Sequence, residues 1–346
     1  MTTRLFRFAP LAVLAALAAG TASTQSSAGD YRVLRRTVLG GEGGWDYLTA
    51  DAPSHRLFVS RGTHVMVVDT RTDSVVGEIP GTPGVHGIAL APELGRGFTS
   101  NGRDSTVTVF DLKTLAPLGT THVTGRGPDA IAYEPVSKRV FTFNGGSGSA
   151  TAVDAATGRV VGTLDLGGRP ESAVSDGAGR MFVNLEDRSE IVPFDARTLR
   201  AGPHWALAGC EEPSGLAIDR AHHRLFAVCS NGKMAVVDAA SGRVVATVPI
   251  GEGPDAAAFD PATQTVFSSN GEGTLTVVHE DTPDRYRVVQ TLATQRSART
   301  MALDPGTHRL YLVTAEFGPA PAATADTPRP RRPMIPGSFV LLTVGR

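Results

Sequence analysis

The chain has 346 residues, of which 41% are hydrophobic and 19% are charged. This composition excludes a disordered chain and a coiled coil, and 39 Gly without a Gly-X-Y period exclude collagen. The formal net charge of −1 provides no global field that attracts a polyanion or a membrane surface. Two Cys are too few for a disulfide-rich scaffold or a multi-cysteine zinc protein.

Residues 1–22 have the layout of a secretory signal peptide. Arg4 and Arg7 precede an apolar run, and small residues follow it. The run is too short for a permanent membrane span, and no later stretch is long enough, so we expect none in the mature chain. Cleavage is expected near Ala22, with Ala28 as the alternative, which predicts a periplasmic or extracellular protein. A buried N-terminal helix is the competing interpretation.

One short phrase recurs along the rest of the chain: a basic or small residue, a hydrophobe, an aromatic residue, then small or β-branched residues. It reads RLFVS at Arg56, RVFTF at Arg139 and RLYLV at Arg309. Its aromatic residues are Phe58, Phe98, Phe141, Phe182, Phe226, Phe267 and Tyr311. They recur about every 42 residues, which predicts seven structural units.

Each unit contains four short runs rich in Val, Ile, Thr and Phe that are separated by turn residues. The third run usually ends in Asp, at Asp69, Asp111, Asp154, Asp195 and Asp238. Each of these carboxylates can accept hydrogen bonds from the backbone of the following turn, so we interpret them as structural. Four strands in each of seven units predict an all-β fold, a seven-bladed β-propeller with four-stranded antiparallel blades over residues 31–346.

The innermost run of each unit is rich in Ala and Gly, as expected where blades converge on the propeller axis. The position that begins this run is occupied by Asp46, His86, Asp129, Glu171, Ser214, Asp255 and Arg299. In a propeller these seven side chains surround the channel mouth on one face, where their proximity perturbs their pKa values. We therefore predict a ligand-binding ring at the mouth.

Three interpretations of this ring remain open. A hard cation such as Ca²⁺ suits the oxygens of Asp46, Asp129, Glu171 and Asp255. A catalytic alternative assigns general acid–base or polarising roles to His86, Glu171 and Arg299. The simplest alternative is a solvated polar channel, which is common in propellers. The sequence assigns no cofactor firmly, and Ca²⁺ is the one candidate.

Other polar residues are interpreted as belonging to turns. The loop asparagines are Asn101, Asn144, Asn184, Asn231 and Asn270. They are typical turn formers, and a position on the rim of the same mouth, together with Glu316, is the alternative. The adjacent His222 and His223 lie in a polar turn, which favours solvated side chains over a pair of metal ligands.

The two cysteines belong to the fifth unit. Cys210 precedes its innermost strand, and Cys229 lies at the end of its second strand. In a four-stranded meander these two points lie on the same face of the blade. An exported compartment is oxidising, so the sequence predicts a Cys210–Cys229 disulfide.

The seventh unit is interrupted by a Pro-rich segment, residues 315–337, which predicts an extended loop. This loop is either a lid or docking segment over one face or a tolerated surface insertion. The unit has no fourth strand of its own after residues 338–344. Residues 31–39 are similar to the outer run of the sixth unit. We therefore predict that the N-terminal strand completes the last blade and removes an open sheet edge.

The stretch from Phe98 to Thr114, FTSNGRDSTVTVFDLKT, resembles the YVTN-type β-propeller repeat. The pieces FNGGSGSATAVDAATGRVV and CSNGKMAVVDAASGRVV are related to it, and similarity to YncE-type exported propellers covers about residues 31–346. The tetrapeptide YVTN is absent, and the fourth unit has NLEDRSEIVPFD in place of Ser-Asn-Gly. The resemblance implies a seven-bladed fold. It implies function only broadly, because such propellers serve binding, surface and lactonase-like roles.

We therefore expect an exported, monomeric binding or scaffold protein that presents the channel mouth to a small ligand, a cation or a protein partner. One alternative is a lactonase-like, metal-dependent hydrolase that uses His86 and Arg299. Another is a single-stranded DNA-binding propeller, an activity of some YncE-like proteins, which the near-neutral charge disfavours. Motifs of serine hydrolases, zinc proteases and c-type haem proteins are absent, and two Trp are few for a quinone-dependent dehydrogenase.

Overall fold

The computed structural model divides the chain into two units, Met1–Asp30 and Tyr31–Arg346. It describes residues 1–2, 29–322, 330 and 332–346. The predicted signal peptide, residues 1–22, therefore lies outside the described residues except for its first two positions. Residues 323–329 and 331 of the Pro-rich segment lie outside them as well.

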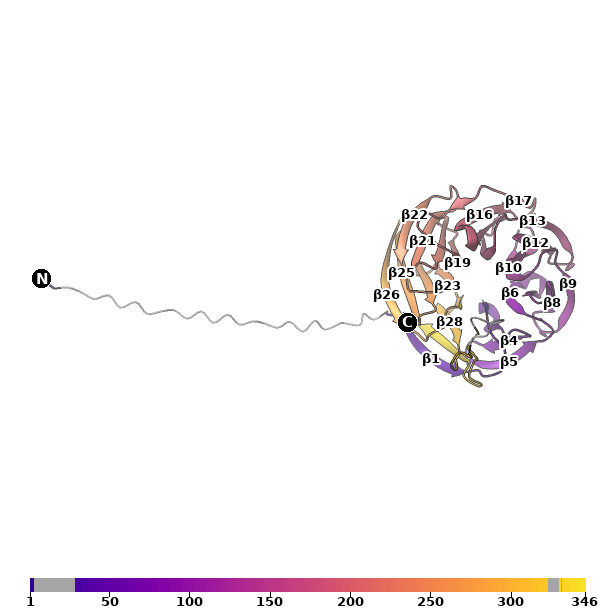
Figure 1. The fold of residues 1–346 in the computed structure, drawn as a ribbon, viewed down its shortest axis with the longest axis horizontal. Coiled ribbons are helices and arrows are strands. Elements are labelled where there is room, and N and C mark those ends of the chain that lie inside the picture. Colours follow the sequence, from indigo (N-terminus) through magenta and orange to yellow (C-terminus); the bar gives the residue numbers. More distant parts are fainter. Residues whose placement is uncertain (3–28, 323–329, 331) are drawn as a thin grey trace. The chain divides into compact units, whose positions relative to one another are not determined.

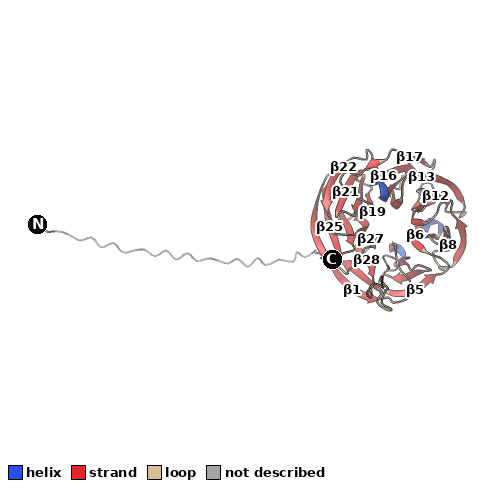
Figure 2. Cartoon of the chain, viewed as in Figure 1, coloured by secondary structure: helices blue, strands red, loops and turns tan. Residues whose placement is uncertain are grey.

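Tyr31–Arg346 forms a closed ring of seven antiparallel sheets, each of which is one blade of a β-propeller (Figure 1). The predicted all-β fold with seven four-stranded blades is confirmed. Strands dominate the ring in Figure 2, and the helices in the described part of the chain are short 3-10 turns. These are η1 (Ala52–Ser54), η2 (Pro92–Leu94) and η3 (Glu186–Arg188).

The first four blades follow one another along the chain. Blade 1 contains β2 (Leu48–Asp51), β3 (Arg56–Ser60), β4 (Val65–Asp69) and β5 (Ser74–Ile79). Blade 2 contains β6 (Val85–Ala91), β7 (Arg96–Asn101), β8 (Thr106–Asp111) and β9 (Pro117–His122). Blade 3 contains β10 (Pro128–Glu134), β11 (Arg139–Asn144), β12 (Ser149–Asp154) and β13 (Val160–Asp165). Blade 4 contains β14 (Pro170–Ser175), β15 (Arg180–Leu185) and β16 (Glu190–Asp195), with an outer edge split into β17 (Arg200–Ala201) and β18 (Trp205–Ala206).

The last three blades complete the ring. Blade 5 contains β19 (Pro213–Asp219), β20 (Arg224–Cys229), β21 (Lys233–Asp238) and β22 (Val244–Pro249). Blade 6 contains β23 (Pro254–Asp260), β24 (Thr265–Asn270), β25 (Thr274–Thr282) and β26 (Arg285–Ala293). Blade 7 contains β27 (Met301–Asp304), β28 (Arg309–Thr314), β29 (Val340–Gly345) and, as its outer strand, β1 (Arg32–Val38).

Large side chains fill the space between blades, and small ones line the axis. The aromatic residues of the seven repeat phrases are all fully buried in the second strands of their blades. The inner strands approach one another too closely for larger side chains. A Cβ on Gly215 would lie 2.6 Å from the backbone N of Ala257, in the inner strand of the next blade. Convergence at the axis therefore explains the Ala- and Gly-rich inner runs.

The N-terminal strand closes the ring, as the sequence predicts. β1 pairs antiparallel with β29, from Arg32 opposite Gly345 to Val38 opposite Val340. A buried carboxylate of blade 1, Asp73, joins both strands. Its Oδ2 lies 2.7 Å from Nε of Arg35 on β1 and accepts a hydrogen bond from Thr343 Oγ1 on β29.

The recurring aspartates at the ends of the third strands stabilise turns. Oδ1 of Asp111 accepts hydrogen bonds from the backbone N–H groups of Lys113 and Thr114, at 3.0 and 2.7 Å. Equivalent bonds join Asp69 to Arg71, Asp154 to Thr157, Asp195 to Thr198 and Asp238 to Ser241. The hydrogen bond from the Thr114 backbone is the main cause of a lowered pKa of Asp111. Their structural interpretation is confirmed.

The arginine of the repeat phrase ties each of the first four blades to the next one. Its guanidinium donates to the backbone carbonyl that follows the turn aspartate of the neighbouring blade. These bonds run from Arg56 to Leu112, Arg96 to Ala155, Arg139 to Ala196 and Arg180 to Ala239. A recurrent charge-assisted hydrogen bond therefore holds adjacent blades together.

The Pro-rich segment lies between β28, which ends at Thr314, and β29, which begins at Val340. Its described ends are joined by an isolated bridge between Phe317 and Met334. The ring of Phe317 lies 6.0 Å from that of Trp45, at the start of blade 1. Both described ends of the segment are thus anchored to the propeller.

Candidate functional site

The structure brings the seven ring residues predicted from the sequence around one cavity of about 720 Å³. Five of them are the second residues of the inner strands β6, β10, β14, β19 and β23. Asp46 and Arg299 lie two residues before β2 and β27. Equivalent positions converge because every inner strand enters its blade from the same face, around the central opening in Figure 1.

His86 lies between carboxylates of both neighbouring blades. Its Nδ1 lies 2.7 Å from Oδ2 of Asp46, within hydrogen-bond geometry, and 3.5 Å from Oδ1 of Asp129. The hydrogen bond with Asp46 is the main reason why the pKa of His86 is raised above its usual range. When protonated, the imidazole places a positive charge between two carboxylates that would otherwise repel each other.

The other carboxylates of the ring hold their protons unusually tightly. Burial, followed by the charge of Asp46, raises the pKa of Asp129 to about 6. Burial, followed by the charge of Asp129, raises the pKa of Glu171 to about 8. Burial also raises the pKa of Asp255 to about 6, although Arg299 Nε lies 3.2 Å from its Oδ2 and opposes the shift. The mouth therefore contains more negative charge than its cations neutralise.

A cation would find its closest set of ligand atoms on three of these residues. The carboxylates of Asp46 and Asp129 and the imidazole of His86 offer ligand atoms that all lie within 4.8 Å of one another. Of the four carboxylates that the sequence predicts as cation ligands, only Asp46 and Asp129 belong to this close group. Glu171 and Asp255 line the same cavity but do not belong to this group, because they come from blades farther around the ring.

Sequence reasoning missed two further carboxylates and an arginine at the mouth. Glu186, Glu212 and Arg169 line the cavity, and Arg169 forms an ion pair with Glu186. Glu186 begins η3, which replaces the usual turn between the second and third strands of blade 4. The signal was visible in the sequence, because NLEDRSEIVPFD departs from the Ser-Asn-Gly pattern at this point.

Tyr47 crosses the ring beside the charged residues. Its hydroxyl donates a hydrogen bond of 2.9 Å to the backbone carbonyl of Glu171, so it joins blade 1 to blade 4. Burial, with nearby carboxylates adding to it, raises the pKa of Tyr47 well above its usual value, so the phenol stays neutral. Only the folded ring places a tyrosine of one blade against a carbonyl so distant in sequence.

Four of the five loop asparagines do not form a rim, whereas Asn231 is partly exposed and donates to the carbonyl of Gly209. Asn101, Asn144, Asn184 and Asn270 are fully buried at the ends of second strands. The amide of Asn101 donates to Thr106 and Thr108 within its own blade. Burial therefore excludes these four side chains from the rim of the mouth. Glu316 lines a neighbouring cavity with Arg296 and Phe317.

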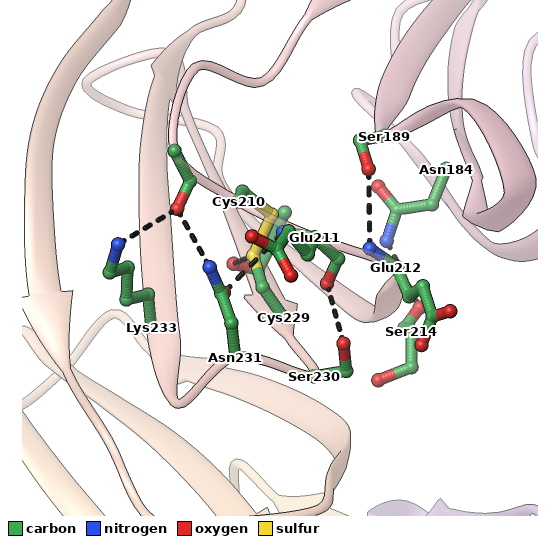
Figure 3. Close-up of a disulfide and its surroundings, with 12 residues drawn as sticks. Asn184, Ser189, Cys210, Glu211, Glu212, Ser214, Cys229, Ser230, Asn231 and Lys233 are labelled. Atoms are coloured by element: carbon green, nitrogen blue, oxygen red, sulfur yellow. Dashed lines mark hydrogen bonds between the residues drawn. A yellow bond between two sulfur atoms is a disulfide. The ribbon is translucent and has the colours of Figure 1, made fainter.

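The structure joins Cys210 and Cys229 in a disulfide beside the mouth (Figure 3). The backbone N and the hydroxyl of Ser230, next to Cys229, both donate to the carbonyl of Glu211, next to Cys210. The disulfide thus holds the segment that carries Glu212 and leads to Ser214. The disulfide therefore limits the movement of this part of the cavity wall.

Comparison with known proteins identifies the repeat family. Residues 103–316 match the family described as outer membrane protein assembly factor BamB. The chain belongs to this family. The BamB-family match includes the ring positions of blades 3 to 7, whereas Asp46 and His86 precede it. No curated protein matches the chain significantly.

Solved structures share the propeller fold at low sequence identity. Hydrazine synthase of Kuenenia stuttgartiensis is 17% identical with a TM-score of 0.70, over 80% of this chain and 94% of that chain. A chain of a mitotic checkpoint complex is 13% identical with a TM-score of 0.72, over 100% of this chain and 99% of that chain. At these identities the likeness establishes the fold alone.

In the part of the chain that the structure describes, no helix has the length and apolarity needed to cross a membrane.

Proposed function

We propose that this propeller is an exported binding protein of YncE type whose channel mouth binds a divalent cation, with Ca²⁺ as the first candidate. The charge balance of the cavity supports this proposal. Its carboxylates are Asp46, Asp129, Glu171, Glu186, Glu212 and Asp255, and its basic side chains are His86, Arg169 and Arg299. An excess of negative charge favours a cation over the phosphates of a nucleic acid.

The observation that carries the proposal is the convergence of Asp46, His86 and Asp129. Oxygen ligands from two carboxylates suit Ca²⁺, which prefers hard oxygen donors. When no cation is bound, a proton on His86 Nδ1 forms a hydrogen bond to Asp46 and lies near Asp129 Oδ1, 3.5 Å from Nδ1. A cation and this proton therefore compete for one position, and binding should strengthen as the pH rises.

Export rests on two separate features. Residues 1–22 have the basic, apolar and small-residue order of a signal peptide. The Cys210–Cys229 disulfide suits an oxidising compartment. Cell fractionation, with mass spectrometry of the mature N-terminus, tests export. A full-length chain retained in the reducing cytoplasm would contradict it.

Calorimetry with Ca²⁺ on chelator-treated protein tests cation binding. We expect a saturable heat at submillimolar Ca²⁺, and Asp129→Asn should weaken the affinity at least about tenfold, because a charged ligand is lost. Glu78→Gln is the matched control, because Glu78 is exposed on the outer strand β5 of blade 1. Absence of heat at millimolar Ca²⁺, or equal losses in both variants, would contradict the proposal.

The second candidate is a lactonase-like hydrolase, and one observation favours it. The His86–Asp46 pair has the geometry of an oriented base, and Arg299 lines the same cavity and can polarise a carbonyl. Lactone hydrolysis with and without chelator tests this candidate. Activity that His86→Gln abolishes would support it, and no turnover above background would exclude it for the lactones assayed.

A further inference from the structure

A second cluster lies on the face opposite the mouth, where blade 5 meets blade 6. Asp219 is the last residue of the inner strand β19, whose mouth end carries Ser214. His222 lies in the turn that follows, and Glu280 comes from β25 in blade 6. Their ligand atoms lie within 4.8 Å of one another, and Asp219 and Glu280 are buried. None of these residues contributes to the channel mouth.

His222 is a departure from the repeat. In blades 1, 6 and 7 the aspartate that ends the inner strand is followed three positions later by Ser or Thr, whose hydroxyl donates to its carboxylate. Asp260 accepts from Thr263 Oγ1 and Asp304 from Thr307 Oγ1. Blade 5 has His222 at this position, so Oδ2 of Asp219 loses that donor. Only Oδ1 is satisfied, by the backbone N–H of Ala221 at 2.9 Å.

Glu280 is an independent departure in the neighbouring blade. The residue after the turn position of the third strand is buried and apolar in blades 2 to 5, as Leu112, Ala155, Ala196 and Ala239. Blade 6 places a carboxylate there that is 1% exposed. Neither oxygen of Glu280 has a hydrogen-bond partner among the described residues. A buried carboxylate without hydrogen bonds is costly unless something compensates its charge.

The three groups converge without forming hydrogen bonds. His222 Nδ1 lies 2.6 Å from Asp219 Oδ2 and 2.9 Å from Glu280 Oε1, yet none of these atoms has hydrogen-bond geometry. Protonated Nδ1 has a single proton and can satisfy only one of the two carboxylates. At the next junction, by contrast, His308 Nδ1 forms an ordinary hydrogen bond of 2.9 Å with Asp260.

We propose that Asp219, His222 and Glu280 form a Zn²⁺ site that joins blade 5 to blade 6. One imidazole nitrogen and two carboxylate oxygens suit this ion, and half-exposed His222 leaves a fourth position accessible to water. The arginine of the repeat phrase has different partners at this junction. Arg224 binds the carbonyl of Pro283 and the carboxylate of Asp284, rather than the carbonyl of residue 280. Arg224 thus still joins the two blades through Pro283 and Asp284, and the metal would add a second link at Glu280.

The test compares zinc binding and thermal stability in four proteins: the unmodified full chain, His222→Asn, His223→Asn and Glu280→Gln. His223 is the matched control, because it is the exposed neighbour of His222 and its φ of 54° also suits Asn. We expect the unmodified chain and His223→Asn to bind one equivalent of Zn²⁺ at this site and to melt at a higher temperature with it. His222→Asn and Glu280→Gln should lose this equivalent, with affinity falling by more than about tenfold.

Glu280→Gln provides a signature that a purely structural role does not produce. Without metal it should melt at a higher temperature than the unmodified chain, because a neutral amide replaces a buried carboxylate that has no hydrogen bond. With Zn²⁺ that order should reverse. Absence of a zinc-induced shift in the unmodified chain, or an unchanged shift in Glu280→Gln, overturns the proposal. Calcium binding at the mouth depends on Asp129, so failure there does not affect this result.

Discussion

The guanidinium of Arg61 stacks on the ring of Phe339, with its central carbon 3.6 Å from the ring centroid. Arg61 belongs to blade 1 and is fully buried, and Phe339 directly precedes β29 of blade 7. Nη2 of Arg61 donates to the carbonyl of Glu42 at 3.0 Å, in the segment between β1 and β2. Burial lowers the pKa of Arg61 to about 10. One cation thus holds the point where the ring closes.

Replacing Arg61 should destabilise the closed ring. Arg61→Ala removes a desolvated cation–π contact and a charge-assisted hydrogen bond, so we expect a loss of about 2–4 kcal/mol in the free energy of unfolding. Urea unfolding followed by tryptophan fluorescence measures it. Arg71→Ala is the control, because its ion pair with Asp69 is exposed, and it should cost less than about 1 kcal/mol. Equal losses would show that Arg61 does not hold the closure.

The buried Asp73 tests the contribution of the closing strand. Asp73→Asn keeps the shape and suits the residue's φ of 57°, but it removes the charge that faces Arg35, 2.7 Å away. We expect a loss of about 1–3 kcal/mol and faster amide exchange in β1. Glu316→Gln, which alters an exposed ion pair with Arg36, should leave both unchanged. Unchanged exchange in β1 for Asp73→Asn would contradict the assigned role.

The mouth carboxylates should make stability fall as the pH rises. The folded-state pKa values of Asp129, Asp255 and Glu171 are raised from 3.8, 3.8 and 4.5 to about 6, 6 and 8. The folded state therefore binds protons more tightly, so their favourable contribution is complete below about pH 4 and is lost as the pH rises through about 6 for the two aspartates and about 8 for Glu171. Protonated His86, whose pKa is also raised, adds a contribution of the same sign.

Urea midpoints at pH 5 and pH 8 measure this effect. The metal-free chain should lose more stability between these values than Glu171→Gln, which no longer ionises at this position. Glu78→Gln, exposed on β5, should follow the unmodified chain. A stability change that Glu171→Gln does not reduce would show that Glu171 contributes nothing to it.

The disulfide should stabilise the wall of the mouth. Cys210 and Cys229 are 19 residues apart, and a bridge of this span contributes about 3 kcal/mol by restricting the unfolded chain. The Cys210→Ala/Cys229→Ala double variant should therefore lose about this amount, and reductant should no longer affect its stability. Urea unfolding with and without dithiothreitol measures both. An unmodified chain whose stability is insensitive to full reduction would contradict this expectation.

The part of the candidate site that occupies the same position in every repeat unit was predictable from the sequence. Aligning the units placed seven residues at one position of seven inner strands, and all seven line one cavity. Glu186 was missed because η3 replaces a regular turn, although its segment departs visibly from the repeat. His222 was interpreted as a solvated turn residue. Its partner Glu280 lies on the next blade, and sequence spacing does not show which side chains meet across a blade junction.

The sequence by itself determined the number of blades, the N-terminal closing strand and the set of residues that begins each inner strand. Local patterns suffice for these features, because each blade folds from consecutive strands with the same spacing of aromatic and turn residues. The tertiary structure decided which charged groups lie next to one another. Asp46, His86 and Asp129 lie on successive blades, and Tyr47 reaches Glu171 across the ring. Such distances and the burial that shifts these pKa values arise only when all seven blades close around one axis.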